Sequence, residues 1–168
     1  MQKDNYSTII DLGSNELRLG VFDKNLSKLF FHTKSISQKN NFDEYSKSIN
    51  FLVREAENKI SNHLENITVL YDSSEICTID LSIKKKLDEK TNLNEACSSI
   101  ILEANQIIKN CYNNKKIIHS IIKKCIINDK EFLNIPDKSF DLNFIILEMK
   151  FICLPYEQYN NVYKIFKK

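Results

Sequence analysis

Glycine and proline are scarce in this chain, which has two of each among 168 residues and no tryptophan. Gly13 and Gly20 do not have the spacing of a P-loop or of a dinucleotide-binding fingerprint, whose glycines recur at fixed steps. No apolar run approaches the roughly 20 residues that a membrane-spanning helix needs. The polar start, Met1-Gln2-Lys3-Asp4-Asn5, is also unlike a signal peptide. We therefore expect no P-loop, no dinucleotide-binding fingerprint and no direct membrane segment.

An excess of one charge is also missing, since 24 basic and 22 acidic residues leave a formal net charge of +2. This balance gives no electrostatic reason to expect nucleic acid as a ligand. The five cysteines lie far apart without a C-x-x-C pair, and an odd number cannot all pair within one chain. Reduced thiols and a cytoplasmic location are therefore expected. With 42% hydrophobic residues, the chain can build one ordinary domain or two small ones.

The first half of the chain predicts a small sheet and one helix. Apolar and β-branched runs predict three strands, at residues 6–12, 17–22 and 29–33. The first of these is the most apolar, so it is expected to be central. Apolar residues recur at steps of three and four over 43–64, which indicates an amphipathic helix with Asp43 as its cap. After a further strand at 67–71, the polar residues 72–74 predict a subdomain boundary.

The second half predicts a separate unit in the order strand, helix, strand, strand, helix. These elements are expected at residues 75–81 or as far as 85, at 94–111, 117–127 and 144–154, and from 155 onward. Asn92 or Asn94 can cap the first helix, and Pro155 suits the first turn of the last one. An apolar stripe on that last helix is expected to pack on a sheet rather than lie on a membrane. Strands interleaved with helices predict an α/β fold with α+β character.

The turn that follows the first strand is the best candidate site. Asp11 ends the apolar run, and Gly13, Ser14 and Asn15 follow it. Two interpretations remain open: a hairpin in which Gly13 supplies a positive φ, or a turn whose amides face a phosphate. The three histidines have no cysteine or carboxylate at metal-ligand spacing, and no serine or cysteine lies in a nucleophile motif. We therefore predict no zinc site and no catalytic residue.

Two stretches resemble known proteins. Ile9-Ile10-Asp11-Leu12-Gly13-Ser14-Asn15, with the strand to Val21, resembles the first phosphate loop of the actin, sugar-kinase and heat-shock chaperone superfamily. Residues 116–129, Ile135-Pro136 and the strand 144–153 are similar to the insert of FtsA, the actin-like bacterial cell-division family. The resemblance implies a partial actin-like (ribonuclease H-like) first lobe over residues 1–74. It also implies a strand-helix-strand-strand insert subdomain over residues 75–168.

The resemblance implies roles for the turn as well, because the complete family fold binds ATP and magnesium. Asp11 would hold magnesium through water. The amides that would meet the terminal phosphates are those of Gly13, Ser14 and Asn15. In the family the second phosphate loop and the adenosine-binding loop follow the insert, whereas this sequence stops at Lys168. Glu16 also stands near where many relatives have a basic residue, and its charge disfavours anions. We therefore expect no cofactor and no ATPase activity for this chain alone.

In the FtsA family, the insert mediates contacts between subunits and with later division proteins. The resemblance thus implies an interaction module whose partners are other FtsA-like subunits and bacterial division proteins, with self-association through the insert. Its expected place is the cytoplasmic face of the inner membrane at the division site, reached through partners. Two alternatives remain: an ATP-binding actin-like protein completed by a second half, and the pilus-assembly relative of FtsA, which has a similar insert.

Overall fold

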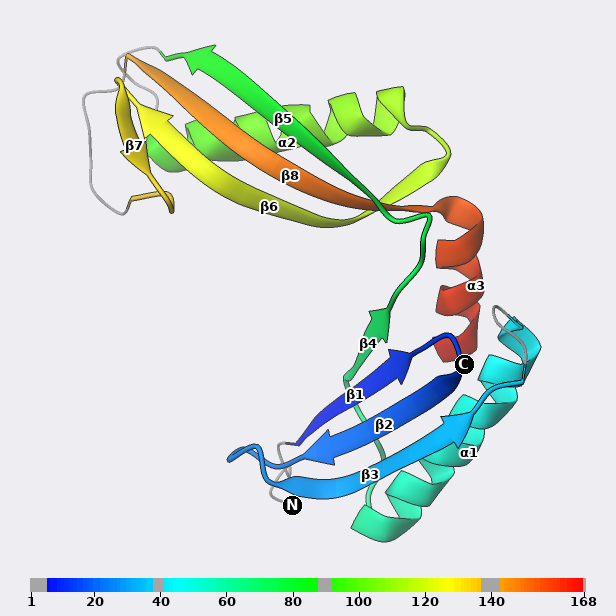
Figure 1. The fold of residues 1–168 in the computed structure, drawn as a ribbon. Helices are drawn as coiled ribbons and strands as arrows, with labels where there is room; N and C mark the ends of the chain where they lie inside the picture. Colours follow the sequence, from blue (N-terminus) through cyan, green and yellow to red (C-terminus); the bar gives the residue numbers. More distant parts are fainter. Residues whose placement is uncertain (1–5, 38–40, 88–91, 137–142, 168) are drawn as a thin grey trace. The chain divides into compact units, whose positions relative to one another are not determined.

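The computed structural model describes residues 6–37, 41–87, 92–136 and 143–167. The expectations for Met1–Asn5 and for Lys168 lie outside these residues. The chain divides into two compact units, Met1–Ser74 with Asn161–Lys168, and Glu75–Asn160 (Figure 1). Each unit has its own four-stranded sheet, and the described residues contain three helices in all. The predicted mixed α/β class is thereby confirmed.

The sheet of the first unit has the strand order β3-β2-β1-β4. Its strands are β1 (Ser7–Leu12), β2 (Glu16–Phe22), β3 (Lys28–Ser35) and β4 (Ile67–Tyr71). β1 pairs antiparallel with β2 and parallel with β4, so the predicted central position of the first strand is confirmed. The parallel pair requires a crossover connection, and helix α1 lies in that connection.

Helix α1 spans Phe42–Ile60, and its N-cap is Asn41 rather than the predicted Asp43. The side-chain oxygen of Asn41 accepts a hydrogen bond from the Glu44 amide at 3.2 Å. The predicted cap, Asp43, lies instead within the first turn, where its charge complements the helix dipole. The choice of Asp43 was therefore wrong by two positions, because an N-cap side chain must reach the amide two or three residues further on.

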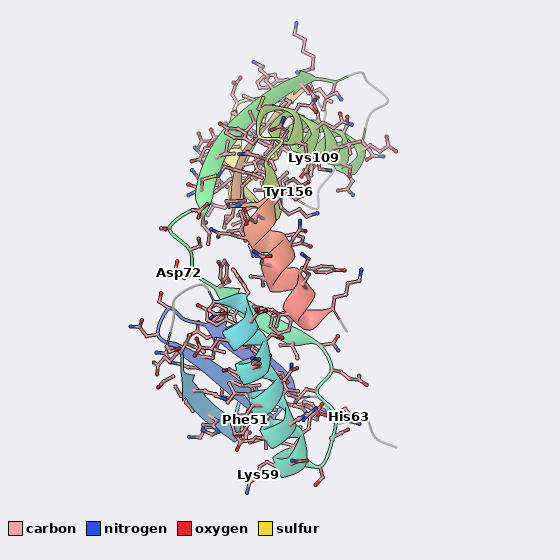
Figure 2. The ribbon with its side chains drawn as sticks, turned by 90° about the vertical axis from the view of Figure 1, so that its right-hand side faces the viewer. Phe51, Lys59, His63, Asp72, Lys109 and Tyr156 are labelled. Atoms are coloured by element: carbon pink, nitrogen blue, oxygen red, sulfur yellow. The ribbon has the colours of Figure 1, made fainter. Side chains whose placement is uncertain are left out.

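α1 also ends four residues before the predicted limit at residue 64. Ser61 has a left-handed backbone, with φ of 55° and ψ of 33°, and this conformation stops the helix. Lys59 lies in the last turn, where a cation is favourable, and Figure 2 shows it near the helix end with His63 just beyond. One face of the helix packs on the sheet. The buried residues of this core are Ile10, Leu12, Leu17, Leu19, Val21, Ile36, Tyr45, Ile49, Leu52, Ala56 and Ile165.

The second unit is an antiparallel sheet with one helix against it (Figure 1). Its strands are β5 (Cys77–Lys86), β6 (Lys115–Ile127), β7 (Lys130–Phe132) and β8 (Phe144–Pro155), in the order β5-β8-β6-β7. Helix α2 (Leu93–Cys111) covers one face, and Asn92 caps it by accepting from the Glu95 amide at 2.8 Å. β7 was not predicted, because three residues are too few to show a period of two.

Helix α3 (Tyr156–Phe166) belongs partly to each unit. Pro155 is the last residue of β8 rather than part of the helix. Residues 161–168 group with the first unit, whereas the sequence pattern predicted that they belong to the second. The reason is apolar packing, since Val162, Ile165 and Phe166 join the core of the first unit. None of the described helices is both long and apolar enough to cross a membrane.

Candidate functional site

The candidate turn connects β1 to β2, which pair from Ser7–Phe22 to Leu12–Leu17. Gly13 does not have a positive φ, so the interpretation that it supplies one is wrong. A Cβ atom at Gly13 would instead lie 2.7 Å from the backbone oxygen of Glu16. The turn requires glycine because the two backbone segments approach each other closely.

Two backbone carbonyl groups of the turn, those of Gly13 and Asn15, have hydrogen-bond partners. The Asn15 carbonyl accepts a hydrogen bond from the Ile36 amide at 2.8 Å, and Tyr45 Oη lies 3.5 Å from the Gly13 carbonyl oxygen. In the described part of the chain, no amide of Gly13, Ser14 or Asn15 donates a hydrogen bond. These three donors, which the sequence analysis singled out, are thus together in one loop and open to an acceptor.

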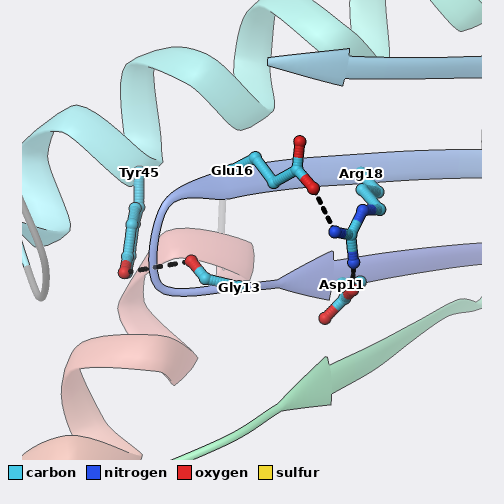
Figure 3. A network of polar contacts seen from close by, with 5 residues as sticks. All are labelled: Asp11, Gly13, Glu16, Arg18 and Tyr45. Atoms are coloured by element: carbon cyan, nitrogen blue, oxygen red, sulfur yellow. Dashed lines mark hydrogen bonds and ion pairs between the residues drawn. The ribbon is translucent and has the colours of Figure 1, made fainter. Parts of the chain in front are cut away.

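The side chains beside the turn form an ionic cluster of Asp11, Glu16 and Arg18 (Figure 3). Arg18 Nη1 lies 2.8 Å from Asp11 Oδ2, and Arg18 Nη2 donates to Glu16 Oε1. The hydrogen bond to Glu16, and then that to Asp11, raises the pKa of the Arg18 guanidinium above its ordinary value. All three side chains are partly exposed, so solvent screens these pairs.

Arg18 is the residue of this cluster that sequence analysis missed. It lies directly opposite Asp11 in the antiparallel register of β1 and β2. The signal that was available is the short connection between the two strands, since pairing Leu12 with Leu17 necessarily pairs Asp11 with Arg18. Residues directly opposite each other on one face of a sheet are close enough for their side chains to interact.

The residues present do not fit a magnesium-bound nucleotide as they are arranged. The free amides suit a phosphate, because several backbone N–H groups in a turn make an anion-binding concavity. However, the carboxylate of Asp11 is already paired with Arg18, and Glu16 adds a second negative charge beside the loop. Two carboxylates share one guanidinium, so the cluster keeps a negative charge that repels phosphate.

Two of the three histidines, His32 and His63, take part in local contacts. His32 Nδ1 lies 2.5 Å from Glu55 Oε2, and His63 Nδ1 lies 3.3 Å from Glu57 Oε1. Within residues 6–37, 41–87, 92–136 and 143–167, no group of three or more His, Cys, Asp or Glu residues is placed to hold a metal ion. These contacts link β3 to α1 and the end of α1 to the residues after it.

Asp11 lies on the face of the first sheet opposite α1, and this face also carries exposed apolar side chains. Leu70, next to Asp11 in the parallel register, is 51% exposed, and Phe31 is 52% exposed. The Phe22 ring lies over Gly20, where a Cβ atom would be 2.7 Å from the ring. The elements that the structure describes in the first unit therefore leave an apolar surface beside the ionic cluster.

Comparison with known proteins assigns the chain to no family. No protein-family model matches it, and no curated protein matches it significantly. The phosphate-loop roles of Asp11, Gly13, Ser14 and Asn15 therefore stay predictions from the resemblance. The same holds for a role in cell division.

Proposed function

We propose that this chain is a protein–protein interaction module of the bacterial division machinery, resembling the N-terminal part of FtsA, and that it does not hydrolyse ATP by itself. Its partners are other FtsA-like subunits and bacterial division proteins. It acts at the cytoplasmic face of the inner membrane at the division site, where those partners bring it.

The observation that carries this proposal is the way the second unit is inserted into the first. The chain leaves the first unit after Ser74, builds the unit Glu75–Asn160, and rejoins the first unit at Asn161. The inserted unit has its own core between α2 and its sheet. A compact insert of this kind can bind partners without chemistry in the first unit, which supports an interaction role like that of the FtsA insert.

Binding between purified proteins tests the interaction role. The full chain should bind an FtsA-like subunit or a late division protein when the two are mixed, and a fluorescent fusion should gather at the division site. A variant that unfolds the insert, Phe151→Asp in the core of the second unit, should lose both properties. If the folded chain binds none of these proteins and is spread evenly through dividing cells, the proposal is wrong.

The ionic cluster supports the absence of ATPase activity, because Asp11 is paired with Arg18 and Glu16 lies beside the loop. Calorimetric titration with Mg-ATP should show no binding to the chain alone. The variant Glu16→Lys gives the matched comparison, since it replaces the repelling carboxylate by a cation and should increase any residual affinity for phosphate. Tight binding of Mg-ATP by the unaltered chain would contradict this part of the proposal.

The open face of the first sheet favours a second candidate, an ATP-binding actin-like protein completed by another half. This face carries the half-exposed apolar side chains of Phe31 and Leu70 beside the ionic cluster, and an exposed apolar patch of this kind often marks a surface that binds another protein or domain. Phosphate release measured on the chain alone and mixed with a second lobe distinguishes the candidates. A pilus-assembly role would be favoured by neighbouring pilus genes, and a division role by neighbouring cell-wall division genes.

A further inference from the structure

Strand β5 forms an outer edge of the second sheet, with β8 on its inner side (Figure 1). It is ten residues long and pairs with β8 without any register shift, from Cys77 opposite Cys153 to Lys86 opposite Phe144. No strand among the described residues pairs with its outer side. A long, regular edge presents alternating unpaired N–H and C=O groups, which form a template for a further strand.

The other long exposed edge of this sheet is protected. β6 extends beyond the short β7, but its register with β8 shifts between Ile117 and His119 and again between Ile122 and Lys124. Lysine pairs also stand at both ends of that segment, 115–116 and 123–124. Bulges and edge lysines are the devices by which sheets avoid edge-to-edge association. β5 has no bulge, and its lysines are confined to one end, at 84–86.

The side chains of β5 are complementary to themselves in one antiparallel register. If Ser82 lies opposite Ser82 of a second copy, Asp80 faces Lys84 of that copy, and Lys84 faces its Asp80. On the other side of the strand, which α2 covers, half-buried Leu81 faces Ile83. Opposite charges and apolar pairs directly across two strands stabilise their association. The same two-fold arrangement therefore pairs opposite charges on one face of β5 and Leu81 with Ile83 on the other, where Ile79 faces Lys85.

The two charged residues are available for such pairing. Asp80 Oδ1 is 3.3 Å from Lys123 Nζ, and the Asp80 side chain is 59% exposed. Lys84 Nζ lies 4.1 Å from the centroid of the Phe144 ring and is also exposed. Neither residue is buried in an ion pair that dimerisation would have to break.

We propose that β5 pairs antiparallel with β5 of a second copy of this chain, with a two-fold axis at Ser82. The two four-stranded sheets then form one continuous sheet, with both α2 helices on the same face. This inference rests on the proposed interaction role and deepens it, because it names the strand, the register and the partner of self-association.

Charge reversal at the two facing positions tests the register. Asp80→Lys alone makes both facing pairs of the dimer lysine against lysine, and Lys84→Asp alone makes both of them acidic. Each variant should raise the dimer dissociation constant by about tenfold or more in sedimentation velocity. A 1:1 mixture of the two variants should restore dimers, because both facing pairs are then of opposite charge. Lys86→Asp is the matched control, because residue 86 faces the uncharged Thr78. Its dimer dissociation constant should stay close to that of the unaltered chain.

A cross-link provides a measurement that does not depend on charge. In a Cys111→Ser background, which removes the exposed native thiol, Ser82→Cys should form an intermolecular disulfide rapidly with diamide, whereas Lys86→Cys should not. Circular dichroism verifies that each variant is folded. Absence of dimers in the unaltered chain, a mixture that stays monomeric, or equal cross-linking at 82 and 86 would overturn the inference. A monomeric chain that still binds division proteins would refute the β5 dimer and leave the proposed function standing.

Discussion

Replacing Thr8 by valine should make the first unit more stable. Thr8 lies in β1, is 1% exposed, and its side-chain oxygen has no hydrogen-bond partner among the described residues. Successive side chains of a strand point to opposite faces of the sheet. Because Ile9 and Asp11 lie on the face opposite α1, Thr8 lies on the face that packs against α1. The hydroxyl therefore loses its hydrogen bonds to water on folding and gains none in return.

The expected magnitude follows from that desolvation. A buried polar group without a partner costs about 1–3 kcal/mol, and the added methyl contributes roughly as much as a buried CH₂, about 0.8 kcal/mol. Because the neighbours must accommodate the slightly different shape, we expect Thr8→Val to raise the free energy of unfolding by about 1–2 kcal/mol. For a chain of this size, each kcal/mol corresponds to a rise of roughly 2–4 °C in melting temperature.

Urea unfolding followed by circular dichroism measures this change, with the two units fitted as separate transitions if they separate. Thr68→Val is the matched control, because Thr68 is exposed on β4 of the same sheet and should change stability by less than about 0.5 kcal/mol. A Thr8→Val variant that is less stable than the unaltered chain would refute the reasoning, since it would mean that the hydroxyl is hydrogen-bonded.

Three further predictions concern the helix cap, the turn and a buried thiol. Asn92→Ala should lower the free energy of unfolding by about 1 kcal/mol in urea titrations, because its side chain caps α2, whereas Asn94→Ala should not. Gly13→Ala should cost about 1–3 kcal/mol in the same assay, because its Cβ would lie 2.7 Å from the Glu16 backbone oxygen. Burial raises the pKa of the Cys97 thiol from 9.0 to about 11, so the folded state binds more protons than the unfolded state between these values. Stability should therefore be fully present below pH 9 and fall as the pH rises to about 11, and Cys97→Ala should reduce that slope in unfolding experiments.

Each of these three predictions would be contradicted by a specific result. Equal losses for Asn92→Ala and Asn94→Ala would mean that the cap bond does not stabilise α2. A Gly13→Ala variant as stable as the unaltered chain would show that the turn adjusts freely. An unchanged slope of stability against pH in Cys97→Ala would assign the alkaline loss to other groups.

Much of the fold was predictable because strand and helix periods are local properties of the chain. Alternation and β-branched content located β1 and β8, and steps of three and four located α1 and α2. The limits of α1 were less accurate, since they depend on Asn41 reaching one amide and on the backbone of Ser61. These are conformations of single residues rather than patterns.

The candidate site was predictable as a turn but not as a cluster. The residue types of Asp11 and Gly13 indicated where the strand ends. The turn requires glycine at position 13 because the Glu16 carbonyl approaches it closely, and not because of a positive φ. This close approach depends on the geometry of the closed hairpin. Arg18 joins Asp11 only once the register of β1 and β2 is set.

The sequence by itself determined the mixed α/β class, the order of the long elements and the break near residues 72–74, because apolar periodicity and polar turns act over a few residues. Only the tertiary structure decided the return of residues 161–168 to the first unit. It also decided that β5 is an edge strand. The physical reason is that register, edges and core membership depend on contacts between residues far apart in the chain, which no local pattern contains.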